Sequence, residues 1–197
     1  MKSIILFSIL TAFTLAQVTN KITLSNGFSL TYQITSPTIS FTLTGSNKGY
    51  IALGFGGSGM DSIDVAAFKW DGTAILGEDR TNLDNQSVVD LDSSKQGCTN
   101  NLTVDKTSTY DSSTGNWNLK FSRPLNTNES NCDQAIQPET AQNLAFAIFK
   151  DFNWQQHKSY SYWKFTLSAS AQKDPNTSSF LVQYSYLTFL FVLMLFI

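Results

Sequence analysis

The sequence is poor in the residues from which many catalytic sites are built. Its 197 residues include one histidine, two cysteines and three methionines, and charged residues make up 14% of the chain. A Ser-His-Asp triad would have to use the only histidine, and no neighbouring motif supports one. The formal net charge is −2 at pH 7, without a basic run, so nucleic acid is not expected as a partner. No Walker or dinucleotide-binding glycine pattern is present.

Long apolar runs occur only at the two ends of the chain. Residues 1–16 combine a lysine, an apolar stretch and small residues, which predicts a secretory signal rather than a membrane anchor. Residues 180–197 form a second apolar run with no charge after it, preceded by a polar spacer at 171–179 and small residues at 168–170. This order is typical of a glycosylphosphatidylinositol (GPI) attachment signal, and a transmembrane tail is the alternative. We therefore expect one domain at 17–170, on the extracellular face of the plasma membrane.

Two cysteines, Cys98 and Cys132, lie within that domain. An even number of cysteines in a secreted chain favours one disulfide, and their spacing is far from that of a CxxC metal pair. Glycosylation sequons occur in the same region and fit an exposed surface. The sequons of the domain are at Asn85, Asn101 and Asn128, and a fourth, at Asn176, lies beyond the expected lipid attachment point.

The middle of the chain is typical of an all-β fold. Short segments rich in β-branched and aromatic residues are separated by Gly, Asn, Ser and Pro, and no segment there has a convincing helical period. Many short strands at regular spacing predict a β-sandwich of about eight to eleven strands. The expected strand regions are 21–35, 38–45, 49–56, 62–70, 101–111, 116–125, 143–150 and 160–170.

Two scarce residue types occur in predicted loops. Met60 ends the glycine-rich loop GFGGSGM, and His157, the only histidine, lies between the last two predicted strands. A lone methionine usually fills a gap in a core, and a lone loop histidine is usually solvated. Together, however, a thioether and an imidazole are the axial ligands of haem iron in electron-transfer cytochromes. Since the chain has no CxxCH motif, such a haem would be noncovalent haem b.

The order of these motifs resembles the DOMON domain. The segment GYIALGFGGSGMDSIDV, with Tyr50 at the position of the family's tryptophan, is similar to the family's W-x-A-x-G-F strand, loop, methionine and acidic strand. FSRPLNT, then Asp133, then NLAFAIFK and the loop of His157 match its later elements. The resemblance covers residues 21–167 and is closest to the cytochrome b-type subgroup, which includes the haem domain of cellobiose dehydrogenase and a plant GPI-anchored auxin-responsive cytochrome b.

The resemblance implies an immunoglobulin-like β-sandwich that binds haem b through Met60 and His157 as iron ligands. It implies an electron-transfer module rather than an enzyme, with a redox partner that is either a transmembrane cytochrome or an extracellular donor or acceptor. Two alternatives stay open, a carbohydrate-binding module and a structural cell-surface protein without haem. The aromatic residues considered for sugar binding are Trp117, Trp154 and Trp163. Several apolar residues near the two ligand loops in sequence are candidates for the walls of a haem pocket, although each by itself is expected to be an ordinary core residue. They are Phe55, Ile63, Phe68, Phe149, Phe152 and Trp154, and the sequence does not decide whether Lys158 or Tyr160 meets a propionate.

Overall fold

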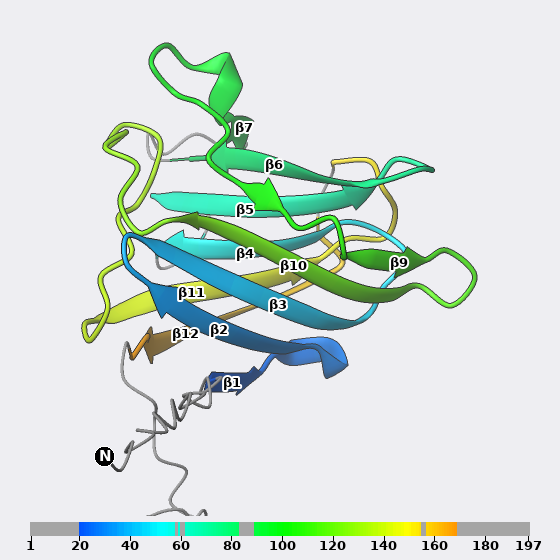
Figure 1. The fold of residues 1–197 in the computed structure, drawn as a ribbon. Helices are drawn as coiled ribbons and strands as arrows, with labels where there is room; N and C mark the ends of the chain where they lie inside the picture. Colours follow the sequence, from blue (N-terminus) through cyan, green and yellow to red (C-terminus); the bar gives the residue numbers. More distant parts are fainter. Residues whose placement is uncertain (1–19, 58, 60–61, 83–88, 155–156, 169–197) are drawn as a thin grey trace, which may run out of the picture.

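The fold is a sandwich of two antiparallel sheets (Figure 1). It was analysed in a computed structural model, which describes residues 20–57, 59, 62–82, 89–154 and 157–168. The first sheet, called here the β3 sheet, has the strand order β1 (Asn20–Thr23), β2 (Ser29–Thr35), β3 (Thr38–Ser46), β10 (Asn116–Pro124) and β8 (Thr103–Val104), with β9 (Thr109–Asp111) also paired to β10. The second, the β4 sheet, has the order β12 (Ser159–Thr166), β11 (Ala141–Ile148), β4 (Ile51–Gly56), β5 (Ile63–Trp70), β6 (Ile75–Thr81) and β7 (Asp90–Leu91).

The predicted all-β class is confirmed. The described residues contain twelve strands and only two short 3-10 turns, η1 (Ser25–Gly27) and η2 (Asp92–Ser94). Each of the eight expected regions contains at least one strand. The sequence analysis missed β6, whose sequence ILGEDRT carries three consecutive charged residues. Among the described residues no helix is long and apolar enough to cross a bilayer, and the two terminal segments lie outside them.

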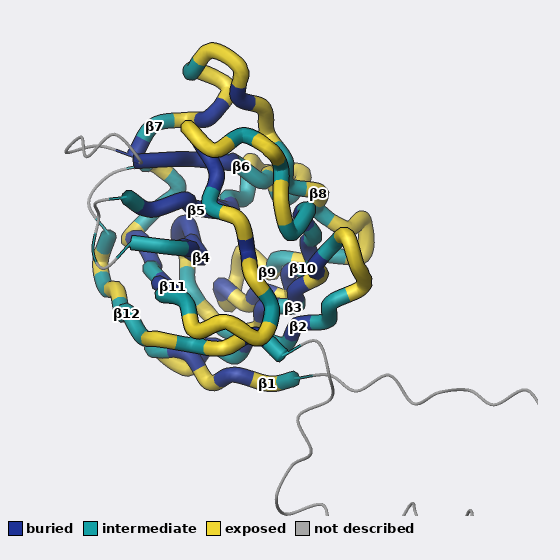
Figure 2. The backbone as a smooth tube through the Cα atoms, turned by 90° about the vertical axis from the view of Figure 1, so that its left-hand side faces the viewer, coloured by how far each residue is buried: buried dark blue, intermediate teal, exposed yellow. Residues whose placement is uncertain are grey.

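The core lies between the sheets and follows from strand alternation. Along β10, Trp117, Leu119 and Phe121 are buried at every second position, and the next inward position is occupied by Arg123, also buried. Because successive side chains of a strand point to opposite faces, these residues meet the inward side chains of the β4 sheet. The end-on view of Figure 2 shows buried residues along the strands of both layers and exposed residues mainly in the connections. On β10, therefore, the charged side chain of Arg123 points into the same interior as its apolar neighbours.

The first and last described strands lie at the same end of the sandwich. The side-chain amide of Asn20 donates to the backbone oxygen of Ser168 over 3.5 Å, and the backbone N–H of Ser168 donates to the Tyr32 hydroxyl over 3.0 Å. The chain therefore enters and leaves the domain at neighbouring points.

Candidate functional site

The outward face of the β4 sheet carries a second apolar cluster, separate from the core. On β4, Ile51, Leu53 and Phe55 belong to the core, whereas Ala52 belongs to the outer cluster. On the neighbouring β5 the alternation is the same, since Phe68 faces the core and Ala67 faces outward. Outward positions of a sandwich are usually polar. An apolar outward face therefore needs a cover, either from the chain itself or from a ligand.

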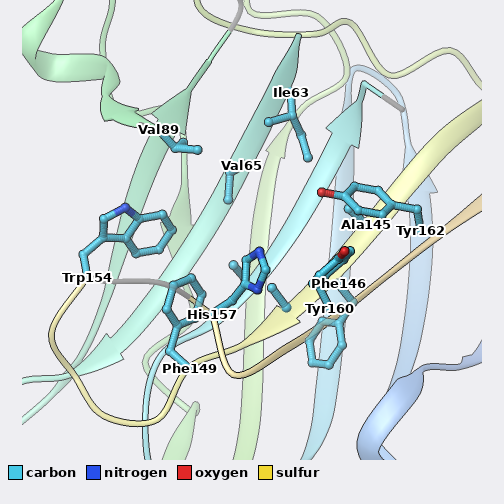
Figure 3. A pocket seen from close by; sticks show the side chains of 12 residues that line it. Ile63, Val65, Val89, Ala145, Phe146, Phe149, Trp154, His157, Tyr160 and Tyr162 are labelled. Carbon is cyan, nitrogen blue, oxygen red and sulfur yellow. The ribbon is translucent and has the colours of Figure 1, made fainter. Parts of the chain in front are cut away.

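Small side chains make the floor of this face hollow. Ala52, Ala145 and Ala147 line a small pocket of about 40 Å³. Gly54 belongs to the same floor, because a Cβ atom there would lie 2.5 Å from Cδ1 of Ile63 and 3.1 Å from Cβ of Ala145. Larger side chains stand around the floor (Figure 3). They are Ile63, Val65, Val89, Phe149, Trp154, His157, Tyr160 and Tyr162. Phe146 is also at the pocket, but its ring packs in the core against Phe28.

His157 points over this floor from the connection between β11 and β12 (Figure 3). The connection is fixed next to it, because the N–H of Lys158 donates to the backbone oxygen of Ile148 over 2.8 Å. The imidazole ring lies 4.5 Å from the Tyr160 ring and 6.3 Å from the Phe149 ring, measured between centroids. Within the described residues it has ring contacts and no hydrogen-bond partner. Its nitrogens are therefore available to a ligand in the hollow.

A charged network borders the hollow on β5 and β6. The hydroxyl of Tyr50 donates to Oε1 of Glu78 over 3.0 Å, and Lys69 and Arg80 form ion pairs of 2.5 and 2.6 Å with the same carboxylate. Burial alone would raise the pKa of Glu78, but the hydrogen bonds from Lys69 and Arg80 outweigh it and the pKa is lowered. The Arg80 guanidinium lies 4.1 Å from the centroid of the Trp154 ring. This cation–π contact holds Trp154 at the edge of the hollow.

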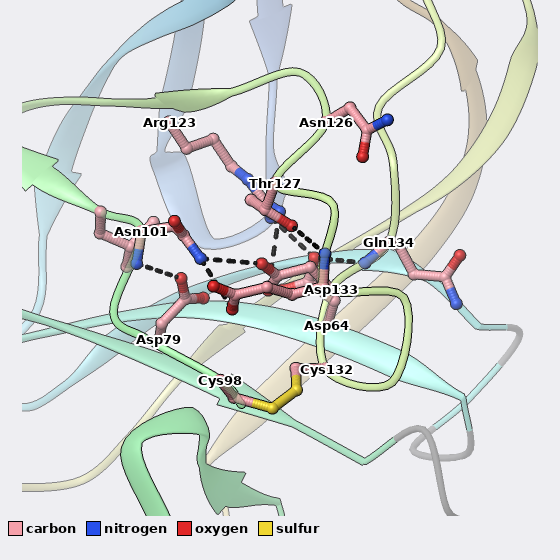
Figure 4. A network of polar contacts seen from close by, with 12 residues as sticks. Asp64, Asp79, Cys98, Asn101, Arg123, Asn126, Thr127, Cys132, Asp133 and Gln134 are labelled. Carbon is pink, nitrogen blue, oxygen red and sulfur yellow. Dashed lines mark hydrogen bonds and ion pairs between the residues drawn. A yellow bond between two sulfur atoms is a disulfide. The ribbon is translucent and has the colours of Figure 1, made fainter. Parts of the chain in front are cut away.

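Arg123 is the centre of a buried polar network between the sheets (Figure 4). Its Nη1 donates to Oδ2 of Asp64 over 2.7 Å, and its Nη2 lies 3.8 Å from Oδ1 of Asp133. The N–H of Gln134 donates to the same Asp64 oxygen over 2.9 Å. These contacts tie β5, β10 and the segment after β10 together.

A family model confirms what these motifs indicate. The model of the DOMON domain matches residues 24–149, well over half of the chain. The chain belongs to the DOMON domain family. The match includes β4, β5, β10 and β11, which carry the hollow's floor and part of the Arg123 network.

Two solved structures share this DOMON fold. The cytochrome b domain of pyranose dehydrogenase from Coprinopsis cinerea is 13% identical, with a TM-score of 0.56 over 74% of this chain and 80% of that one. The cytochrome domain of cellobiose dehydrogenase from Myriococcum thermophilum is 14% identical, with a TM-score of 0.53 over 82% of this chain and 94% of that one. No curated protein sequence matches the chain.

Some of the residues predicted for the site line the hollow in the structure, and others lie elsewhere. His157 lies in the hollow, while Met60 lies outside the described residues, three positions before Ile63 in the sequence. Phe55 and Phe68, two of the candidates for the pocket walls, are instead core residues between the sheets, which was the expectation for each of them by itself. Phe152 packs against both apolar clusters without lining the hollow, whereas Ile63, Phe149, Trp154 and Tyr160 line it. Lys158 is exposed and does not line it.

The surface predictions had mixed outcomes. The Cys98–Cys132 disulfide is present, which confirms the pairing. Asn128 is exposed, Asn101 is half-buried, and Asn85 lies outside the described residues. The Asn101 amide donates to Oδ2 of Asp133 over 3.0 Å, so a glycan on that nitrogen would replace one of its two N–H groups.

The tryptophans considered for sugar binding have different environments. Trp117 is 2% exposed, and its indole N–H donates to the backbone oxygen of Asn47 over 2.8 Å. Trp163 packs against the core. Only Trp154 of the three lines the hollow.

The sequence analysis missed the small outward residues that form the floor. Ala52, Gly54, Ala145 and Ala147 carry no chemical signal by themselves. Their signal is positional, because in GYIALGF and NLAFAIF large apolar residues alternate with alanine or glycine. An inward face of Ile, Leu and Phe backed by an outward face of Ala and Gly is the pattern of a sheet that something flat lies against.

Proposed function

We propose that this domain is an extracellular b-type cytochrome that holds haem in the hollow on the β4 sheet and transfers electrons. His157 and Met60 are the iron ligands. The observation that carries the proposal is His157, a half-buried imidazole without a hydrogen-bond partner among the described residues, over an apolar floor of small side chains. The fold shared with two cytochrome domains supports it.

The residues of the hollow fit a flat apolar ligand. Its floor is Ala and Gly, so a planar ring can approach the backbone of β4 and β11 without meeting long side chains. Phe149 and Trp154, whose rings stack 4.7 Å apart, form one apolar wall. An apolar wall excludes water and leaves the imidazole as the polar group aimed at the ligand, as pockets for cofactors usually require.

The position of Ile63 supports Met60 as the second ligand. Ile63 lines the hollow at the start of β5, and Met60 precedes it by three residues. Three residues of extended chain span at most about 10 Å, so Met60 is tethered close to the hollow. Apart from Met1 and the tail's Met194, it is the only methionine of the sequence.

Haem supplies one-electron redox chemistry, and a Met/His pair keeps the iron six-coordinate and raises its potential. The chain binds and orients the group and shields it from water. We therefore infer an electron-transfer module rather than a catalytic domain. Its partner is either a transmembrane cytochrome or an extracellular donor or acceptor.

The ligand assignment is tested by visible spectroscopy of the purified secreted protein. We expect a low-spin b-type spectrum on reduction, its loss in His157→Ala, and a lower midpoint potential in Met60→His, because imidazole is a harder donor than a thioether. Lys158→Ala is the matched control, because Lys158 is an exposed neighbour that does not line the hollow, and alanine keeps the backbone N–H that donates to Ile148. If both ligand variants keep the wild-type spectrum and potential, the assignment is wrong. Glycan binding without a haem band would favour the carbohydrate-binding alternative.

We further propose that the domain is tethered to the outer leaflet by a lipid attached near residue 170, which replaces residues 171–197. The end of the last described strand supports this, because Ser168 lies beside Asn20 at one end of the sandwich. A tether there leaves the β4 sheet and its hollow free to meet a partner.

A further inference from the structure

Four aspartates are buried around Arg123. Asp64 and Asp92 have no exposed surface, Asp79 is 2% exposed and Asp133 is 6% exposed. They come from separate elements, namely β5, β6, η2 and the segment after β10. Arg123 is the cation of this cluster among the described residues. A buried carboxylate normally has its own partner, since an unpaired buried charge costs several kcal/mol.

In three of these aspartates only one of the two carboxylate oxygens accepts a hydrogen bond. Asp64 accepts hydrogen bonds from Arg123 and Gln134 at Oδ2, while its Oδ1 has no partner. Asn101 donates through its backbone to Oδ2 of Asp79 and through its amide to Oδ2 of Asp133. In both of these aspartates Oδ1 has no hydrogen-bond partner. In each of these three carboxylates, therefore, one oxygen accepts hydrogen bonds and the other accepts none.

Asp92 has no hydrogen-bond partner at either oxygen, although it is fully buried. It lies in the first position of η2, directly after β7. Ligand oxygens of Asp92, Glu129 and Asp133 lie within 4.8 Å of one another, as do those of Asp64, Asp79 and Asp133. The two groups share Asp133 and so form one continuous cluster.

We propose that this cluster binds a calcium ion between β6, η2 and the segment after β10, with Asp92, Asp79 and Asp133 as carboxylate ligands and Asp64 at its inner edge. Two oxygens bound to the same Ca²⁺ at 2.3–2.6 Å lie at most about 5.2 Å apart. The spacing satisfies this within each of the two groups, and Asp133 belongs to both. The Oδ1 atoms of Asp64, Asp79 and Asp133 accept no hydrogen bond, although that of Asp133 lies 3.8 Å from Nη2 of Arg123. Together with both oxygens of Asp92 they supply five hard donors, and water completes a shell of six to eight.

The donor set selects the class of ion. All ligands are oxygens, which suit Ca²⁺, Mg²⁺ or Mn²⁺ and not a thiophilic metal. The nearby sulfurs of Cys98 and Cys132 are joined in a disulfide and are not thiolate ligands. Irregular spacing from four different elements suits the flexible shell of Ca²⁺ better than the strict octahedron of Mg²⁺. Four buried carboxylates against one guanidinium leave an excess of negative charge that a divalent cation compensates.

Protons are the competing solution to the same charge excess. Burial, together with Asp79 and Asp133, raises the pKa of Asp92 to about 9. A neutral Asp92 would donate a hydrogen bond to Asp133 and need no metal. The two solutions differ in one measurable respect, which is whether calcium stabilises the protein at a pH where Asp92 would otherwise hold its proton.

The test is thermal unfolding of the full secreted protein at pH 7.5, with haem content held equal, in chelator and in 10 mM CaCl₂. At the 0.1–1 mM affinity typical of extracellular calcium modules, we expect the melting temperature to rise by about 3–10 °C in calcium. Isothermal titration calorimetry should give one ion per chain. Asp92→Asn should lose most of the rise and weaken binding at least tenfold. In chelator it should melt no lower than wild type, because asparagine is uncharged, as is Asp92 while it holds its proton.

Asp105→Asn is the matched control, because Asp105 is an exposed turn aspartate whose acceptor role asparagine preserves. It should keep the full calcium response. If Asp92→Asn is not secreted, Asp79→Asn takes its place. An absent calcium response in the wild type, or an equal response in the cluster variants, would overturn the proposal and leave protons as the neutralising species. Neither readout depends on haem ligation, so the result is independent of the proposed cytochrome function.

Discussion

Replacing Arg123 by methionine should destabilise the fold strongly. The guanidinium has no exposed surface and is 2.7 Å from a fully buried carboxylate oxygen of Asp64. Its Cζ also lies 5.1 Å from the centroid of the Phe55 ring. Methionine keeps an apolar stem over that ring but leaves Asp64 without its cation. Removing one member of a buried ion pair costs about 3–5 kcal/mol, a large part of a typical domain's stability.

The size of the effect can be separated from lost packing by a double-mutant cycle. Asp64→Asn keeps the shape of the side chain and removes its charge. If the cost of Arg123→Met comes from the stranded carboxylate, then adding Asp64→Asn should recover a substantial part of it. The free energy of unfolding of the wild type, the two single variants and the double variant is measured by urea denaturation, followed by tryptophan fluorescence. Urea is chosen because it is uncharged and does not screen the ion pair. The single variant should also melt about 6–20 °C lower than wild type.

Two results would refute this reasoning. An Arg123→Met variant within 1 kcal/mol of wild type would mean that the ion pair contributes no net stability. A double variant whose loss equals the sum of the two single losses would mean that the charges do not interact. A change in the slope of the urea transition would point instead to an altered unfolded or native state.

Three further outcomes are expected. In chelator the free energy of unfolding should fall as the pH rises from 5 to 9. Burial raises the pKa values of Asp64, Asp79 and Asp92 to about 6, 7 and 9, so in this range the folded state loses protons that the unfolded chain has already released. A urea midpoint that does not change with pH would contradict this. Replacing Cys98 and Cys132 by alanine should cost about 3–4 kcal/mol in urea titrations and leave the reduced haem spectrum unchanged. Phosphatidylinositol-specific phospholipase C should release the protein from intact cells without its apolar tail, whereas recovery of the tail peptide from the membrane-bound form would indicate a transmembrane helix.

Much of the fold was predictable because its strands follow period-two alternation. The segment NWNLKF alternates polar and apolar residues, and in β10 its apolar members are buried. Strand β6 was missed because Glu78, Asp79 and Arg80 make it look like a surface loop. The structure shows why these charges are tolerated there, since Asp79 and Arg80 are buried with partners from other elements. Those partners are distant in sequence, and no local pattern reveals them.

The position of one candidate site residue was predictable from the sequence, and the floor and walls of the hollow were less so. The scarcity of histidine singled out His157, and the structure places it in the hollow. Phe55 and Phe68 were considered for the pocket walls because they are aromatic and close to the loops in sequence, although a core role was expected for each of them by itself. A strand sends neighbouring residues to opposite faces, so proximity in sequence predicts the wrong side half of the time. The alternation that placed the core could also have assigned both phenylalanines to it.

Strand β5 connects the two sites of this domain. Its Asp64 faces inward to Arg123, while Ile63 and Val65 on either side face outward to the hollow. An outward face of small residues contributes little packing of its own, so the position of the strand depends on what holds it from inside and from its neighbours β4 and β6. The Asp64–Arg123 ion pair holds β5 from inside. A cation bound by Asp79 and Asp92 would fix β6 and η2, and Val89 of the hollow lies between these two elements in the sequence. The buried charges therefore have a function that apolar residues at the same positions would serve less well, because directional contacts fix the register of the strands on which the hollow's floor is built.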